Sequence, residues 1–315
     1  MKRVLLILLI TTLLLGCSNK QQAQNKTYRI AVITMMQGGE FWGALKNGAR
    51  SARSATGSVL EFLAPVNESD YEGQISAVQR AIDQQFDAIV LSPSHYTRLE
   101  DVVAKARSKG IKVVFADTSL MNVHPDFFIT ADYQAIGKAM AEHAFSHFAE
   151  GEPMKALVLG SMPNTSSMTA IVEALAANFA KKEGAEIVNA TYSFTDEAIA
   201  KDITTSALAS DPSINLIFAL EEYTAHGVAN ALKENQQVHF IAFGTTQYEI
   251  QLLERGVIDA LVVVNSFNLG YRAVMAAIDL LNGIKPIEKL VDFDLVTKES
   301  MFSEEHQRLL FQTLR

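Results

Sequence analysis

The stretch "DAIVLSPSHYTRLEDVVAKARSKGIKVVFADT", residues 87–118, contains the unit from which the fold is built. Residues 87–93 and 111–117 are rich in apolar and β-branched side chains, which is typical of strands buried in a parallel sheet. Between them, residues 97–110 show the spacing of an amphipathic helix, and Gly110 stands where a helix commonly ends. A strand, a helix and a second strand within about 30 residues indicate a βαβ unit.

The same alternation continues outward in two successive arrays. The first begins with the strand-like "YRIAVIT" at residue 28, and the second begins with "DFFIT" at residue 126 and ends with the helical "LGYRAVMAAIDLLNG". A strand-like segment at 289–299 and a short helix at 303–315 follow. The pattern predicts an α/β protein with two doubly wound, Rossmann-like lobes, although the two arrays show no convincing sequence repeat.

The N-terminal segment has the pattern of a bacterial lipoprotein signal. Lys2 and Arg3 precede Val4–Leu15, whose twelve residues would span about 18 Å as a helix, too short for a hydrocarbon core of roughly 30 Å. The sequence Leu-Leu-Gly-Cys that follows resembles a lipobox and holds the only cysteine, Cys17. We therefore expect residues 1–16 to be a signal peptide, Cys17 to carry a lipid and residues 17–27 to form a tether. A plain signal peptide with a chance cysteine is the alternative.

Composition narrows the class of function. Loss of residues 1–16 leaves 25 basic against 35 acidic side chains, a formal net charge of −10, which argues against a nucleic-acid partner. Apolar residues make up 49% of the chain, which is ample for two cores. We find no phosphate loop, dinucleotide fingerprint, nucleophile elbow or zinc-protease motif. The sequence thus predicts an extracytoplasmic, lipid-anchored, monomeric protein that is not an enzyme and needs no cofactor or metal.

Aromatic and acidic side chains follow the first-array strands, at the sheet edge where ligands of open α/β sheets bind. Phe41 and Trp42 come after the first strand and can offer a flat apolar face to a sugar ring. Asp117 ends the fourth strand and can accept two hydrogen bonds from hydroxyls or pair with an amine. The alternatives are that the two aromatic rings only pack the first helix and that Asp117 is a cap or turn residue.

The second array has polar residues at equivalent places. Glu221 and Glu222 follow the strand "NLIFAL", where one acid can face the cleft and the other can favour a helix N-terminus through its dipole. Asn265 follows "ALVVV" and offers both a donor and an acceptor. Thr118 and Phe194 complete the predicted ligand-binding set.

Residues 28–300 resemble type I periplasmic binding proteins of the ribose-binding, LacI-related group. The segments that carry the likeness are "EFW", "DAIVLSP", "GIKVVFADT", "ITADYQAIGKAMAEH", "FALEEYTAHGVANALKE", "IAFGTT" and "NSFNLGYRAVMAAIDLLNG". The resemblance implies three hinge strands between the lobes, a cleft that closes on its ligand, and delivery to an ABC permease. It places the crossings near Thr130–Ala131, Val264–Asn265 and Val291–Phe293, with lobes of 28–130 plus 265–292 and of 131–264 plus 293–315. The helix pair with which related repressors bind DNA is replaced here by the lipoprotein signal.

Several positions depart from the family's usual sugar-binding pattern. Thr118 and Ile171 stand where arginines are usual, and Glu221 and Glu222 where an asparagine and an aspartate are usual. Other departures are Glu40, His95, Gly244 and Val264. The remaining set is rich in carboxylates and aromatics and lacks arginine, so we expect a ligand that donates hydrogen bonds: an amino sugar, an amine-bearing metabolite or a small polyol.

Two alternatives to transport stay open. The protein could present its ligand to a membrane histidine kinase or chemoreceptor, which the missing sugar set and the tail after Ser300 favour. It could also be a surface enzyme with a lobe-closing site.

One histidine pair raises the question of a metal. His143 and His147 stand four residues apart on a predicted helix and could meet one ion. Because the sequence shows no third ligand near them, we expect an exposed helix face and no metal.

Overall fold

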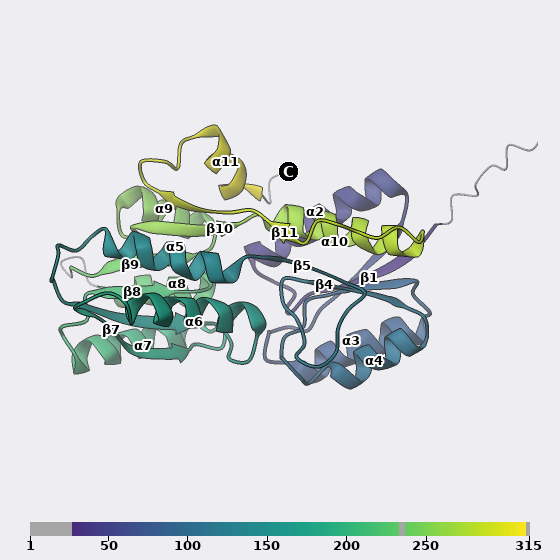
Figure 1. The fold of residues 1–315 in the computed structure, drawn as a ribbon, viewed down its shortest axis with the longest axis horizontal. Coiled ribbons are helices and arrows are strands. Elements are labelled where there is room, and N and C mark those ends of the chain that lie inside the picture. The colour runs from purple at the N-terminus through teal and green to yellow at the C-terminus, as the bar shows by residue number, and fades with distance from the viewer. Residues whose placement is uncertain (1–26, 233–236, 313–315) are drawn as a thin grey trace, which may run out of the picture.

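The computed structural model describes residues 27–232 and 237–312 and consists of two α/β lobes side by side (Figure 1). Each lobe is built on one six-stranded sheet. The predicted fold class is therefore confirmed. The predicted signal peptide, Cys17 and nearly all of the predicted tether lie outside the described residues.

The first lobe has a fully parallel sheet with the strand order β11-β5-β4-β3-β1-β2. Along β1, Ile30 and Val32 join the core formed with α2 and α10, whereas Ala31 and Ile33 join the core formed with α3 and α4. This two-residue alternation explains why the strands are apolar throughout, because both faces are covered. The strands are β1 (Arg29–Ile33), β2 (Val59–Leu63), β3 (Ala88–Leu91), β4 (Lys112–Ala116), β5 (Phe127–Ala131) and β11 (Leu290–Val291), and the helices α2 (Glu40–Thr56), α3 (Tyr71–Asp83), α4 (Glu100–Ser108) and α10 (Ser266–Leu281).

The second lobe repeats this plan with the order β12-β10-β9-β8-β6-β7, in which only β12 is antiparallel to its neighbour. Helices α5 and α6 cover one face, and α7, α8 and α9 the other. The strands are β6 (Met154–Gly160), β7 (Ala185–Tyr192), β8 (Leu216–Ala219), β9 (His239–Phe243), β10 (Ala260–Val264) and β12 (Phe293–Thr297), and the helices α5 (Tyr133–Phe145), α6 (Ser166–Phe179), α7 (Glu197–Ser210), α8 (Glu222–Ala231), α9 (Gln247–Arg255) and α11 (Glu304–Leu310).

The chain passes between the two sheets at three points. It leaves β5 for α5 at Asp132, β10 for α10 at Asn265, and β11 for β12 at Asp292. The Asn265 amide donates to the Asp292 carbonyl at 2.9 Å, which joins two of the crossings. Such short, hydrogen-bonded crossings can act as a hinge between rigid lobes.

The C-terminal segment returns to one of these crossings. The buried Gln312 side chain donates to the Val264 carbonyl at 2.9 Å and accepts from the Phe267 amide at 2.9 Å. Gln312, which follows α11, is thereby fixed at the junction of β10 and α10.

Within the described residues, no helix is both long enough and apolar enough to span a membrane.

Candidate functional site

A cavity of about 90 Å³ lies between the lobes, lined by the residues that follow strands of both sheets. The first lobe contributes segments after β1, β2 and β4, and the second contributes segments after β6, β8 and β9. This is the edge at which open α/β sheets bind ligands. Five of the predicted ligand residues line the cavity: Phe41, Trp42, Asp117, Glu221 and Glu222.

The cavity is acidic and contains no compensating base. Four carboxyl groups line it, Glu68, Asp117, Glu221 and Glu222, and no lysine, arginine or histidine is among its described lining residues. The remaining wall is largely apolar or aromatic. Buried carboxylates without a counter-charge are unfavourable, so this arrangement favours either protonated carboxyl groups or a partner that donates hydrogen bonds to them.

Asp117 is held by backbone geometry and by a tyrosine. Its φ of 74° is unusual for a residue other than glycine, and the Tyr133 hydroxyl donates a hydrogen bond to its carboxylate. Burial raises the pKa of Asp117 to about 7, although the bond from Tyr133 opposes this shift, and the charge of Glu68 adds to it. Tyr133 begins α5 in the second lobe, so this bond joins the two sides of the cleft.

Glu68 also joins the lobes. It accepts a hydrogen bond from Trp42 Nε1 at 3.1 Å within the first lobe and one from Thr195 Oγ1 at 3.3 Å across the cleft. Burial raises the pKa of Glu68 even though these bonds stabilise its charged form. Trp42 is itself only 5% exposed, so its indole is fixed between the core and this carboxyl group.

The two adjacent glutamates cap different helices. Glu221 is the N-cap of α8 and accepts from the amides of Tyr223 and Thr224 at 3.0 and 3.1 Å. Glu222 instead accepts from the Glu40 amide of the first lobe, at 3.1 and 3.0 Å to its two oxygens, and so caps α2 across the cleft. Both glutamates line the cavity, and burial is the main cause that raises the pKa of Glu221 to about 8 and of Glu222 to about 7.

The lobes are in contact, so the structure is a closed state. Besides Glu222 and Glu68, the Tyr96 amide donates to the Asn164 carbonyl and the Ser119 amide to Ser166 Oγ, both at 2.8 Å. Together with the bond from Tyr133 to Asp117, five hydrogen-bonded contacts among the described residues thus join the lobes.

Three of the predicted ligand residues do not line this cavity. Thr118 is fully buried and donates to the Pro93 carbonyl, which supports the loop behind the cavity wall. Phe194 is 51% exposed outside the cavity. Asn265 caps α10 by accepting from the Asn268 amide, at the hinge. Backbone and cap hydrogen bonds use the polar groups of Thr118 and Asn265, and Phe194 faces solvent, so a role for these three residues in ligand binding stays a prediction.

A fifth carboxyl group lies behind Gly244, one of the positions that depart from the sugar-binding pattern. A Cβ at residue 244 would lie 2.3 Å from both carboxylate oxygens of Glu249. Glu249 is fully buried, its Oε2 accepts from the Thr246 amide, and its Oε1 has no hydrogen-bond partner. Burial raises the pKa of Glu249 well above its usual range.

Glu68, Tyr133 and Glu249 were not among the residues predicted from the sequence. Glu68 follows a strand, so the rule used for the other candidates would have found it, whereas Tyr133 reaches the cavity only because α5 starts at a crossing. Possible ligands that are distant in sequence do lie beside His147, because ligand atoms of His147, His239 and Asp259 lie within 4.8 Å of one another.

Comparisons with known proteins agree with this architecture. The D-allose-binding periplasmic protein of Escherichia coli is 24% identical over 279 residues, which cover 84% of this chain and 89% of the relative. The ribose import binding protein of Bacillus subtilis is 23% identical and covers 88% of both chains. A solute-binding protein of an ABC transporter from Agrobacterium vitis, solved with bound D-fucose, superposes with a TM-score of 0.84 at 26% identity and covers 90% of this chain and all of its own.

The family model described as a periplasmic binding protein domain matches residues 30–285. The matched range includes the crossings at Asp132 and Asn265 and all five predicted residues that line the cavity. The relatives are binding proteins of transport systems, as expected for a chain that is not an enzyme. The chain belongs to the periplasmic binding protein family.

Proposed function

We propose that this protein is an extracytoplasmic solute-binding lipoprotein that closes on a small hydrophilic ligand and delivers it to an ABC permease. The observation that carries the proposal is the cavity between the lobes, lined by four carboxyl groups and the aromatic pair Phe41 and Trp42 without a basic side chain. The allose-binding, ribose-binding and fucose-bound relatives support a sugar-like ligand.

The acidic lining supports a ligand rich in hydrogen-bond donors, such as an amino sugar, another amine-bearing metabolite or a small polyol. An ammonium group would supply the missing counter-charge, and hydroxyl groups would donate to carboxylate oxygens. An acidic ligand would add a like charge to a buried acidic cavity and is disfavoured.

Closure supplies the signal that a permease can recognise. A ligand that contacts Asp117 of the first lobe and Glu221 of the second stabilises the closed state relative to the open one, and only this difference in affinity shifts the equilibrium. Presentation of the closed form to a histidine kinase would use the same switch, and neighbouring permease and ATPase genes or a kinase gene would distinguish the two outputs.

Mass spectrometry of small molecules released by denaturing the purified protein tests the ligand class. We expect a neutral or cationic molecule with several donors, at up to one per chain. Recovery of a carboxylated or phosphorylated molecule at that ratio would contradict the proposed specificity.

The lipid anchor has a separate test. Cells labelled with a radioactive fatty acid should incorporate the label into the wild-type protein and not into the Cys17→Ser variant, which should leave the membrane fraction. A labelled Cys17→Ser protein would overturn the anchor while leaving the binding proposal intact.

A further inference from the structure

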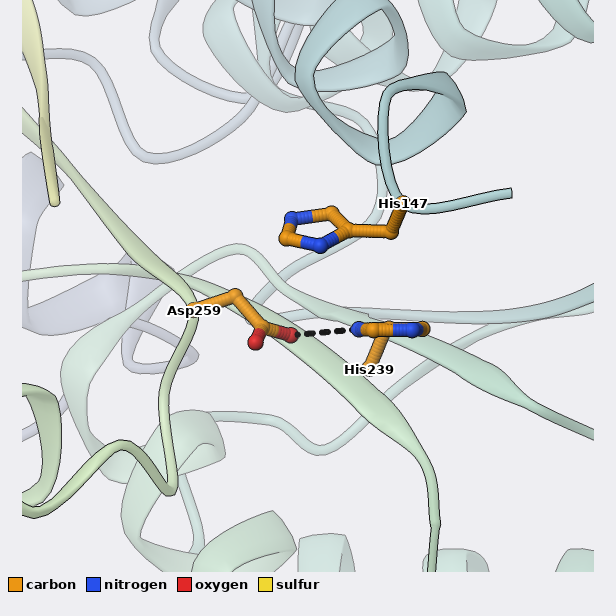
Figure 2. A group of neighbouring side chains, drawn as sticks. All are labelled: His147, His239 and Asp259. Carbon is orange, nitrogen blue, oxygen red and sulfur yellow. Dashed lines mark hydrogen bonds and ion pairs between the residues drawn. The ribbon is translucent and has the colours of Figure 1, made fainter. Parts of the chain in front are cut away.

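Two histidines and an aspartate meet at the end of the second lobe that faces away from the cavity. His147 follows α5, His239 begins β9 and Asp259 directly precedes β10 (Figure 2). These are the amino ends of the strands, whereas the cavity lies at their carboxyl ends. The cluster is therefore a feature separate from the ligand site. It is the one group of at least three possible metal ligands within the described ranges 27–232 and 237–312.

Ligand atoms of the cluster lie close enough to be drawn onto one metal ion. One such atom from each of His147, His239 and Asp259 lies within 4.8 Å of the others. The Nε2 atom of His143 is 3.2 Å from that of His147, and His239 Nδ1 is 3.1 Å from Asp259 Oδ2. Neighbouring ligand atoms of a tetrahedral zinc ion, at bond lengths near 2.0–2.1 Å, are separated by roughly 3.3 Å, so the side chains would move together by up to about 1.5 Å on binding an ion.

Contacts among residues of several elements hold the side chains of His147, His239 and Asp259 in place. The rings of His147 and His239 stack with their centroids 4.4 Å apart, and the Asp259 carboxylate points at the edge of the His239 ring (Figure 2). The Phe240 amide donates to Asp259 Oδ2 at 2.8 Å and fixes the carboxylate. A site assembled from rigid strand ends loses less conformational freedom when it binds an ion.

We propose that His147, His239 and Asp259 form a binding site for a divalent transition-metal ion, with His143 as a fourth ligand. Imidazole nitrogen favours Zn²⁺, Cu²⁺ or Ni²⁺, whereas Mg²⁺ and Ca²⁺ prefer a full set of oxygen ligands. The ion would join the C-terminal end of α5 to β9 and β10. Because α5 starts at the crossing that carries Tyr133, the ion stabilises the helix that also borders the ligand cavity.

Equilibrium dialysis of the purified protein, made without a histidine tag, against Zn²⁺ in excess Mg²⁺ tests the proposal. Elemental analysis should find one Zn²⁺ per chain, and Zn²⁺ should raise the melting temperature while Mg²⁺ alone should not. His147→Gln and Asp259→Asn should each weaken Zn²⁺ binding at least about tenfold. The exposed His124, which lies outside the cluster, provides the matched control His124→Gln and should leave binding unchanged.

Two results would overturn the site: no stoichiometric Zn²⁺ on the wild-type protein, or Zn²⁺ binding that persists undiminished in both cluster variants. Circular dichroism of each variant shows that it is folded. If Asp259→Asn unfolds, His147→Gln alone decides, because that side chain lies after the end of α5 and makes no backbone hydrogen bond in the described structure.

Discussion

The second lobe holds ionisable clusters at its two ends, and the clusters are built in opposite ways. At the carboxyl ends of the strands, Glu221 and Glu222 share a cavity with acids of the first lobe, no base is among the lining residues that the structure describes, and the pKa values of the two glutamates are raised to about 8 and about 7. At the amino ends, Asp259 lies between histidines and its pKa is lowered. The Asp259 carboxylate is stabilised by hydrogen bonds from His239 and from the Phe240 amide, whereas the cavity acids have no basic neighbour among the described lining residues. Uncompensated buried charge of this kind is typical of functional sites, where a ligand supplies what the protein omits.

The largest effect is expected from removing the carboxylate at the centre of the acidic cluster. Asp117→Ala should weaken binding of the ligand by roughly 100-fold or more, because a charge-assisted hydrogen bond is lost in a buried site. Isothermal titration calorimetry measures the change, and circular dichroism should show an intact fold. The matched control is Asp101→Ala on the exposed face of α4, which should bind normally. Normal affinity in Asp117→Ala would remove that residue from the site.

Glu222 tests the connection between the cluster and closure. Glu222→Ala removes the acceptor that caps α2 from the opposite lobe, so we expect about tenfold weaker binding and a more open apo protein. Small-angle scattering should show a larger radius of gyration than wild type. Glu222→Gln keeps an acceptor and should behave closer to wild type. Equal scattering profiles for all three proteins would separate Glu222 from closure.

The raised pKa values predict how stability depends on pH. Glu221 and Glu222 have pKa values near 4.5 in the unfolded chain and of about 8 and about 7 in the folded apo protein, so the folded state retains their protons over this window. Their contribution to stability is complete below about pH 4.5 and is lost as pH rises through 7 to 8. The melting temperature of apo wild type should therefore fall relative to Glu221→Gln between pH 5 and pH 8, by about 5 °C.

The difference in melting temperature between wild type and Glu221→Gln is used because several histidines oppose the loss of stability with rising pH. Burial lowers the pKa of His95, His143 and His226, and lowered histidine pKa values increase stability as pH rises. These contributions are the same in wild type and in Glu221→Gln and cancel. A pH-independent difference would show that Glu221 titrates normally.

Substitution in the histidine cluster should change the stability of the protein with the opposite sign and by a smaller amount than substitution of Glu221. Asp259→Asn replaces an ionised carboxylate whose pKa is lowered, so at pH 7 without metal it should destabilise the protein by ~1 kcal/mol or less. Glu221→Gln should stabilise the protein at pH 8 in the same urea-denaturation assay. If both substitutions destabilise equally, the contrast between the clusters is wrong.

The architecture was predictable from the chain because it depends on local pattern. Apolar strands that alternate with amphipathic helices define the two lobes, and the rule that ligands bind beyond strand ends located Asp117 and both glutamates. The cross-cleft bonds of Glu222 to Glu40 and of Tyr133 to Asp117 depend on how the lobes meet, which no local pattern encodes.

The same limit applies to the predicted residues that lie outside the cavity. Thr118 and Asn265 stand at strand ends as expected, but their polar groups are used by a carbonyl and by a helix cap. His239 and Asp259 are about 90 and 110 residues from His147 in the sequence, and only the sheet order places them together.

The most direct test of the account measures the melting temperature of the apo protein with a matched set of ligands: a hexose, its amino derivative and its uronic acid, at one pH near 7.5. The account predicts the largest increase with the amino sugar, a smaller increase with the neutral sugar and none with the uronic acid. Stabilisation by the uronic acid alone would contradict it.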